Sequence, residues 1–228
     1  ILMFMPIITS LYSVGKKQEI RDLYRGVTKW VFLFNLPLML TLVVFSKEIL
    51  VFLFGPIYQQ AYKSLIILAI GYFVLSLAHT SIYVLKMLAK TKLLMLNATI
   101  SLAVNIILNI LLIPKFGIVG AATSVAVALI TNHTISVIQT YKLLNIQPYK
   151  KVYIKMLFCG AILFTPLFYI KETIKPSLTL FIFMLAVTYC LYFVLILFSR
   201  SLEKTDKYII SSVEKRFKIK IKIDRFIK

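Results

Sequence analysis

Long apolar runs, separated by short connections that carry most of the charge, constrain the fold of this chain more than any other feature. The clearest pair lies within residues 97–139, where two runs meet at the short turn 113–117 and Lys115 is the only formally charged residue. Each run approaches the ~20 residues with which a helix crosses the ~30 Å hydrocarbon core of a bilayer. Backbone groups inside lipid must bond within the protein, so these runs are predicted to be transmembrane helices.

The composition agrees with this interpretation. The chain is 60% hydrophobic and only 15% charged, with a mean hydropathy of +0.90, which is outside the range of soluble domains. A net charge of +19 could indicate nucleic-acid binding, but the basic residues lie between apolar runs and form no patch on a folded domain. We therefore expect membrane lipids, and no nucleic acid, as partners. The chain begins inside an apolar segment, so we also expect it to be part of a longer protein.

The predicted fold class is all-α: a polytopic transmembrane bundle of about six complete spans plus a partial first one. The partial helix covers 1–12 and is followed by a polar loop at 15–29. The sequence predicts spans at 30–46, 64–85, 93–113, 118–140, 152–170 and 177–199. Asn35-Leu36-Pro37 predicts a kink in the first full span, because proline removes a backbone hydrogen bond. Residues 49–58 are predicted to form an interfacial turn.

The distribution of Lys and Arg predicts the orientation, since these residues are retained on the cytoplasmic side. If the loop 15–29 is cytoplasmic, 22 of the 27 basic residues lie on that side. The other five are Lys47, Lys63, Lys115, Lys171 and Lys175. We therefore expect a multi-pass plasma-membrane protein with a cytoplasmic C-terminus. Its tail, 200–228, is predicted to be either an amphipathic helix on anionic lipid or a solvated end.

The second full span carries a row of polar side chains. Steps of 4, 3, 4, 3 and 4 residues place them on one helix face: Tyr72, Ser76, His79, Tyr83, Lys86 and Lys90. The first five are candidates for a substrate cavity, because tyrosines can stack on sugars and Lys86 can attract phosphate as a point charge. The alternative is that the tyrosines pack at interfaces and the lysines only follow the positive-inside rule.

A second candidate group lies in the loop 15–29. Arg21, Arg25 and Lys29 could meet a diphosphate at the cytoplasmic mouth of a transport path. The alternative is a purely topogenic role for these three cations.

Uncharged polar and small residues in 97–139 predict close helix packing. Asn97, Ser101, Asn105 and Asn109 recur at every fourth position, where amides can bond across helices. Gly117 and Gly120 begin a small-residue face on the next span. The residues assigned to helix packing are Asn105, Asn109, Gly117 and Gly120.

Ionisable groups inside the predicted spans are few. None of the eight acids lies within a span, so this part of the chain offers no acidic ion-coupling site, and any coupling ion stays unassigned. His79 and His133 are expected to be separate, hydrogen-bonded interior histidines, of which His79 alone merits testing as a titrating group. We expect no metal site, no cofactor, no catalytic residue and no enzymatic activity.

Three motifs, in order, resemble those of a known family. NIILNILLIPKFGIVGAATSVAVAL, beginning at Asn105, resembles a segment of polysaccharide and lipid-linked oligosaccharide flippases of the multidrug/oligosaccharidyl-lipid/polysaccharide (MOP) exporter superfamily. PIITSLYSVGKKQEIRDLYRGVTKW, from Pro6, and ILVFLFGPIYQQA, from Ile49, are similar to two further segments of these proteins. The resemblance covers residues 6–140.

The resemblance implies a fold of two six-helix lobes around a cavity that opens alternately to each side. On that register, residues 1–140 are part of the C-terminal transport lobe, 141–199 are two additional spans and 200–228 are a basic cytoplasmic tail. The implied partners are a lipid-linked glycan and the N-terminal lobe of the same protein. The expected function is flipping of a lipid-linked oligosaccharide or polysaccharide precursor across the plasma membrane. The alternatives are a cation-coupled multidrug exporter of the same superfamily, a membrane enzyme of polysaccharide assembly, or a structural membrane subunit.

The topology can be tested by cysteine labelling. Cysteines placed at positions 115 and 175 should react with an impermeant reagent from outside only, because both positions lie in connections that carry few basic residues. Labelling of these positions from the cytoplasm alone would contradict the topology.

Overall fold

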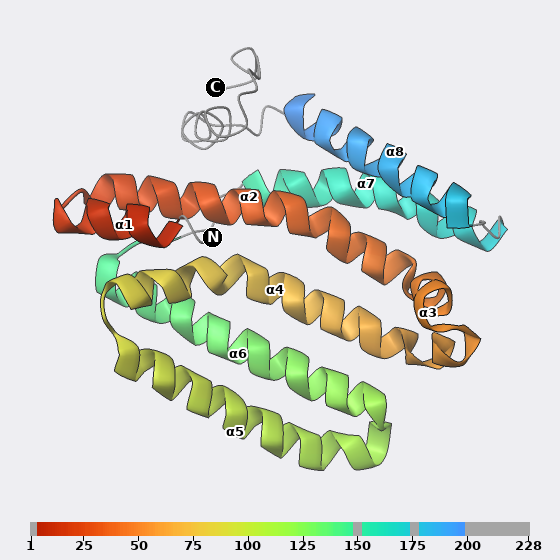
Figure 1. Cartoon of the computed structure of the whole chain (residues 1–228), viewed down its shortest axis with the longest axis horizontal. Coiled ribbons are helices and arrows are strands. Elements are labelled where there is room, and N and C mark those ends of the chain that lie inside the picture. Colours follow the sequence, from red (N-terminus) through yellow and green to blue (C-terminus); the bar gives the residue numbers. More distant parts are fainter. Residues whose placement is uncertain (1–3, 148–151, 174–177, 199–228) are drawn as a thin grey trace.

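A computed structural model describes residues 4–147, 152–173 and 178–198, and every regular element in these ranges is helical. The long helices lie side by side with their axes roughly aligned (Figure 1). The elements are α1 (Phe4–Ser13), α2 (Lys17–Val44), α3 (Ser46–Phe54), the 3₁₀ helix η1 (Pro56–Ala61), α4 (Tyr62–Met87), α5 (Thr91–Phe116), α6 (Ile118–Leu144), α7 (Val152–Thr173) and α8 (Leu178–Phe198).

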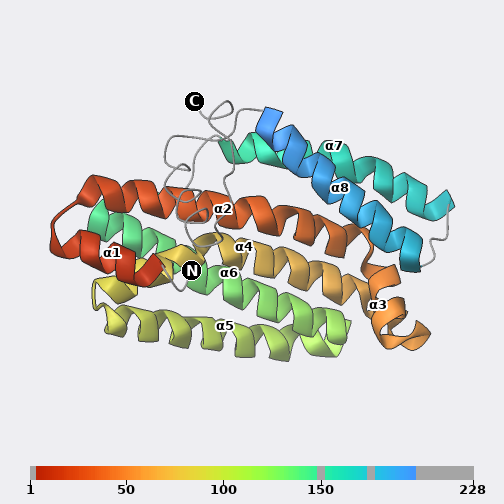
Figure 2. The same cartoon turned by 45° about the horizontal axis from the view of Figure 1, so that its top comes forward.

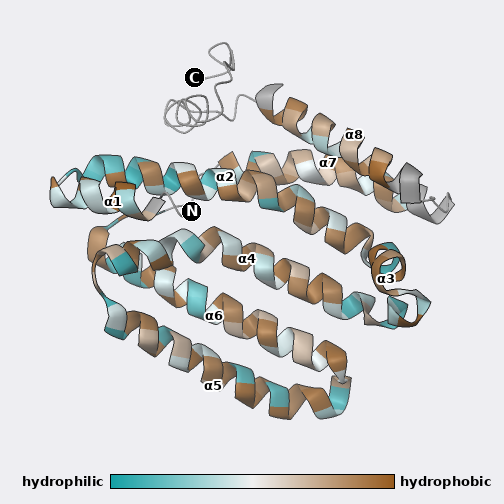
Figure 3. Ribbon diagram, viewed as in Figure 1, coloured by the Kyte–Doolittle hydropathy of each residue, from teal (hydrophilic) through white to brown (hydrophobic). Residues whose placement is uncertain are grey.

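The predicted transmembrane bundle is confirmed. Among the described residues, five helices are long and apolar enough to cross a membrane, and α8 adds a shorter apolar stretch, Ile182–Ile196. Apolar residues dominate these helices along most of their length, whereas polar residues gather at the beginning of α2 (Figure 3). The predicted tail at 200–228 lies outside the described residues.

The helix α2 packs between two groups of helices. On one side it contacts α4, which packs on α6, which in turn packs on α5; on the other side it contacts α7 and α8 (Figures 1 and 2). Successive long helices alternate in direction. As a result α4 and α6 run parallel to each other, although α5 separates them in the sequence.

The prediction of a polar loop at 15–29 is wrong, because α2 begins at Lys17 and continues as one helix of 28 residues to Val44. Its first turns are amphipathic. Ile20, Tyr24 and Thr28 recur at every fourth position and are buried. The charged residues of this segment occupy the remaining positions, so a charge-rich sequence still forms a packed helix.

Two further predictions concern the turn at residues 49–58 and the kink at Pro37. Residues 49–58 form no simple turn, since α3 extends to Phe54 and η1 begins at Pro56. The helix α2 continues through Pro37 and changes direction in its second half (Figure 1). The Thr41 hydroxyl donates to the Pro37 carbonyl oxygen at 2.9 Å, so this polar side chain is engaged within its own helix one turn after the proline.

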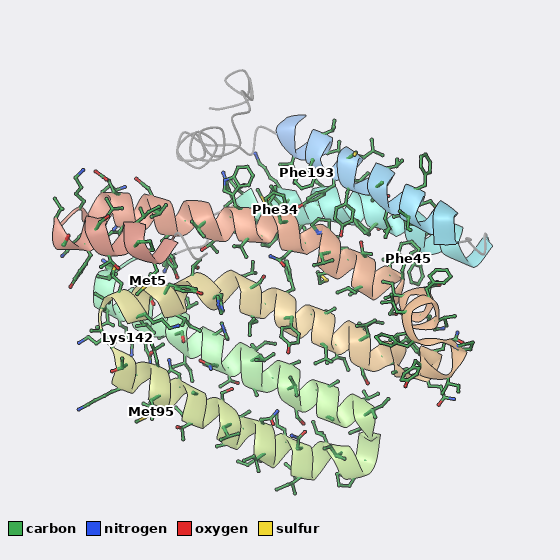
Figure 4. All side chains as sticks on the ribbon, viewed as in Figure 1. Met5, Phe34, Phe45, Met95, Lys142 and Phe193 are labelled. Atoms are coloured by element: carbon green, nitrogen blue, oxygen red, sulfur yellow. The ribbon has the colours of Figure 1, made fainter. Side chains whose placement is uncertain are left out.

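Aromatic side chains join α2 to the last two helices. The ring of Phe32 meets that of Tyr153 edge-on at 4.8 Å, and Phe34 lies 5.4 Å from Phe193 of α8 (Figure 4). Tyr192 is fully buried in the same cluster. At the far end of α2, Phe45 is also fully buried and packs with Phe164. These contacts fix α7 and α8 against α2.

The helix α5 presents much of its apolar surface outward. Asn97 is its one buried residue, whereas Ile106, Ile107, Ile110 and Leu111 are exposed. Such a face suits contact with lipid or with another part of a longer protein, since either would remove these side chains from water.

Two glycines lie where neighbouring helices approach closely. A Cβ added at Gly71 would lie 2.7 Å from the Ala126 Cβ, and one at Gly120 would lie 2.4 Å from the Leu112 carbonyl oxygen. The predicted packing role therefore fits Gly120. It does not fit Gly117, where an added Cβ would meet nothing within 4 Å. Gly117 instead has a φ of 56° in the tight turn between α5 and α6, a conformation that glycine adopts readily.

The glycine contacts predict that replacing glycine by alanine costs more stability at position 120 than at position 160. Gly120→Ala should lower the free energy of unfolding of the full-length protein by about 1–3 kcal/mol, because backbone atoms must shift to admit the methyl group. Gly160→Ala is the matched control, since its Cβ would meet only the flexible ends of Leu36 and Leu40. Unfolding in detergent or bicelles measures both effects. Equal losses in the two variants would contradict the packing role of Gly120.

Candidate functional site

Hydrogen bonds between helices gather toward one end of the bundle, where α2 begins and α4 ends. The Tyr24 and Ser81 hydroxyls lie 2.6 Å apart, and those of Thr28 and Thr80 lie 2.8 Å apart, so two pairs join α2 to α4. The Thr140 hydroxyl of α6 donates to the Ser81 carbonyl oxygen at 3.4 Å. Interhelical hydrogen bonds of this kind hold membrane helices in register, because lipid offers no competing partner.

A second polar contact joins α5 to α6. The Asn97 and Gln139 side-chain amides each donate to the other's oxygen at 2.8 Å, and Asn97 also donates to the Ser136 hydroxyl at 3.2 Å. Further along, the Ser101 hydroxyl donates to the Ala128 carbonyl oxygen at 2.7 Å. These bonds connect the first half of the predicted asparagine stripe to the neighbouring helix.

The second half of the stripe behaves differently. The Asn109 amide donates to the Asn105 oxygen on the same helix at 3.0 Å, so this bond does not cross between helices. The Asn109 oxygen is buried, and no hydrogen-bond partner for it lies in the described part of the chain. The expectation of cross-helix bonding therefore holds for Asn97 and Ser101 and fails for the Asn105–Asn109 pair.

The predicted polar row on α4 divides into a connected part and an isolated part. His79 meets Tyr83 edge-on with ring centroids 5.4 Å apart, and the Lys86 ammonium lies 5.2 Å from the centre of the Tyr83 ring. Tyr72 is exposed, and the Ser76 hydroxyl donates to the Phe73 carbonyl oxygen of its own helix. The structure thus brings His79, Tyr83 and Lys86 together and leaves Tyr72 and Ser76 apart from them.

His133 joins this group from α6. Its ring stacks on that of His79, with centroids 5.9 Å apart and an angle of 13° between the planes. The sequence did not predict this pairing, since 54 residues separate the two histidines. Spacing alone places His133 on one helix face with Ser136 and Thr140, but it does not identify a partner on another helix.

The three cations predicted at the cytoplasmic mouth lie in different environments. Arg21 is half-buried, and the Arg25 guanidinium donates from Nε to the Gln147 carbonyl oxygen at 2.9 Å. Lys29 is 5% exposed, so it is enclosed by the bundle. Arg25 therefore ties α2 to the segment after α6 through Nε, and this bond leaves the N–H donors of its two Nη atoms out of the contact.

The described residues contain no cluster of three or more His, Cys, Asp or Glu side chains that could hold a metal ion. The candidate site is therefore a face of aromatic, imidazole and ammonium groups, running from the His79–His133 stack to Lys86. Such groups can bind sugars by stacking, accept or donate protons, and attract anions.

The fold and this polar face define the chain as part of a multi-pass helical membrane protein. Residues 4–111 match the MatE family. The chain is 31% identical over 221 residues to an uncharacterized membrane protein of Methanocaldococcus jannaschii, a match that covers 92% of this chain and 42% of that protein. It is 34% identical over 128 residues to the probable low-salt glycan biosynthesis flippase Agl15 of Haloferax volcanii, a match that covers 56% of this chain and 27% of that protein. No solved structure matches the chain.

The MatE match over residues 4–111 and the similarity to the Haloferax protein named as a flippase confirm the resemblance to the MOP exporter superfamily predicted from the three sequence motifs. The matched residues include all of α2 and α4, and thus His79, Tyr83 and Lys86. The matches cover less than half the length of either relative.

The paired amides of Asn97 and Gln139 predict strong energetic coupling between α5 and α6. Asn97→Leu alone should destabilise the full-length protein, because it leaves the Gln139 amide without its two bonds. Adding Gln139→Leu should recover part of the loss, giving a coupling energy of about 1 kcal/mol in a double-mutant cycle. Unfolding in bicelles measures the cycle. The same cycle on Asn97 and the exposed Ile106 is the control, and equal coupling in both would contradict the contact.

Proposed function

We propose that the chain is the C-terminal part of a flippase that moves a lipid-linked oligosaccharide or polysaccharide precursor from the cytoplasmic to the outer face of the plasma membrane. The match of residues 4–111 to the MatE family supports a transporter and argues against an enzyme. The name of the Haloferax relative supports a glycan substrate. The observation that carries the proposal is the connected face of His79, Tyr83 and Lys86 on α4, within the family match.

The groups on this face suit the head of such a substrate. A lipid-linked glycan presents sugar rings and a phosphate or diphosphate. The Tyr83 ring offers a stacking surface, and Lys86, exposed near the end of α4, offers a positive charge. The polar head would occupy a cavity between two lobes while its lipid tail stays in the bilayer, and rocking of the lobes would switch access.

The distribution of basic residues supports the proposed orientation. The end of the bundle that holds the start of α2 carries Lys17, Arg21, Arg25, Lys86, Lys92 and Lys142, whereas the opposite end carries Lys47, Lys63 and Lys115. The first end would be cytoplasmic under the positive-inside rule, which would place the C-terminus there as well. We keep the proposed division into residues 1–140 of the transport lobe, two additional spans at 141–199 and a basic tail at 200–228.

Loss of the full-length protein tests the function itself. Deleting its gene in the source organism should make the lipid-linked glycan accumulate on the cytoplasmic leaflet and should remove the glycan from the cell surface. Unchanged surface glycan after deletion, in a strain without a second flippase, would contradict the proposal.

A charge-removing substitution tests the site. Lys86→Met in the full-length protein should lower glycan export about tenfold or more, since a hydrogen bond to a charged group contributes about 1.5–3 kcal/mol. The methionine keeps the apolar stem, so the protein level should stay unchanged. Lys92→Met is the matched control, because Lys92 is also exposed and lies at the same end of the bundle, on α5. Equal export in the two variants would exclude Lys86 from the substrate site.

A further inference from the structure

The stacked pair His79–His133 lies where α4 and α6 make a close contact. The two helices run parallel and approach closely at Gly71 and Ala126, so their imidazoles can stack across the interface. His133 is 4% exposed, and His79 is half-buried. Both rings belong to helices that are long and apolar enough to cross a membrane. An ionisable group in such a place is costly and is a candidate for function.

One hydrogen bond fixes the tautomer of His133. Its Nδ1 lies 2.8 Å from the Leu129 carbonyl oxygen, four residues earlier on α6. A carbonyl oxygen can only accept, so Nδ1 carries the hydrogen and donates it. A neutral imidazole has one donor and one acceptor nitrogen, and therefore Nε2 of His133 holds a free lone pair.

That lone pair has no partner among the described residues. Nε2 of His133 is buried without a hydrogen-bond partner there, and so is Nδ1 of His79. A buried polar atom without a partner is unfavourable inside a membrane bundle, where water cannot replace the missing bond. The pair thus presents two unsatisfied ring nitrogens within one interhelical contact.

We propose that His79 and His133 form a binding site for a single proton, whose occupancy couples to the transport proposed above. The proton, taken from water at one membrane face, adds to the lone pair of His133 Nε2 as an N–H bond and is later returned to water. A second proton on the pair is disfavoured, because two imidazolium rings with centroids 5.9 Å apart would repel each other in a medium of low dielectric constant.

The titratable groups printed next to the pair are Tyr83 and Lys86 of α4, and the described acids lie near helix ends. On α4, Tyr83 contacts His79 and Lys86 lies over Tyr83. The other titratable or basic groups on the described elements that pack on α4 or α6 are Tyr12 of α1, Lys17, Arg21, Tyr24, Arg25 and Lys29 of α2, Lys47 of α3, Tyr58 of η1, Tyr62, Lys63 and Tyr72 of α4, Lys92 and Lys115 of α5, and Tyr141 and Lys142 of α6. The acids on these elements are Glu19 and Asp22 in the first two turns of α2 and Glu48 of α3. Within the described spans the histidine pair is therefore the group best suited to hold a proton reversibly.

Proton binding at this place would act on a contact that connects three helices. Ser81, two residues after His79, bonds to Tyr24 of α2 and accepts from Thr140 of α6. A positive charge on the pair would also repel the Lys86 ammonium on the same face. The charge state of the pair would therefore change both the α4–α6 contact and the field at the proposed substrate face, and this consequence depends on the proposed function.

Direct observation of the proton tests the site without any transport assay. The full-length protein, labelled with ¹⁵N-histidine and placed in nanodiscs, is titrated by NMR between about pH 5 and pH 8, the range in which histidines change charge. His79→Gln and His133→Asn assign the two signals. We expect one proton for the pair, with the titration midpoint of His133 changed by His79→Gln. Independent protonation of both rings, or no protonation of His133 in this range, would overturn the proposal.

His133→Asn removes the nitrogen proposed to bind the proton and keeps the hydrogen bond to the Leu129 carbonyl oxygen. Its amide can donate to the Leu129 carbonyl oxygen as Asn35 donates to Val31 at 2.8 Å, while the second ring nitrogen is lost. In proteoliposomes with a lipid-linked glycan, an imposed pH gradient should accelerate the wild-type protein, and His133→Asn should work at the rate measured without a gradient. Retained acceleration in this variant would overturn the proton site and leave the flippase intact. Absence of glycan movement in the wild type would instead refute the flippase, while the NMR titration still decides the proton site.

Discussion

The structure depends on one constraint, namely that backbone groups in hydrocarbon must find their hydrogen bonds inside the protein. Helices meet it along their length, and hydroxyl side chains inside the spans donate to carbonyl oxygens one turn earlier on the same helix. The Thr41 hydroxyl donates to the Pro37 carbonyl oxygen, and the Ser124 hydroxyl donates to that of Gly120. Many polar side chains in the spans are thus engaged by their own helix, so a polar residue in a transmembrane run is not by itself evidence of a site.

The polar groups that bond between helices, unlike those that bond within one helix, indicate which helices are neighbours. Lipid competes weakly for such groups, and apolar burial gives little preference for one helix neighbour over another, so close contacts and hydrogen bonds select the arrangement. Here Tyr24, Thr28 and Thr140 bond to α4, and Asn97 bonds to α6. Close approaches at Gly71 and Gly120 complete the packing of α4, α5 and α6. The proposed substrate face and the histidine pair lie on this part of the bundle.

The sequence predicted the row on α4 because helical periodicity places side chains three and four residues apart on one face. It did not predict His133 as a partner of His79, since a stack between parallel helices has no signature in sequence spacing. The periodicity also could not distinguish Asn97, which bonds to α6, from Asn109, which bonds to Asn105. The many charged residues at 17–29 led to the wrong prediction of a loop. The buried positions Ile20 and Tyr24 keep this segment helical.

The sequence by itself determined the fold class, the approximate spans and the family resemblance, because run length, the requirement for internal backbone bonds and three local motifs all act within single segments. Only the tertiary structure decided which helices touch, which amides bond across them and which histidines meet. Those choices depend on the geometry of parallel and antiparallel packing. This packing places the ring centroids of His79 and His133 5.9 Å apart, although 54 positions separate the two residues in the chain.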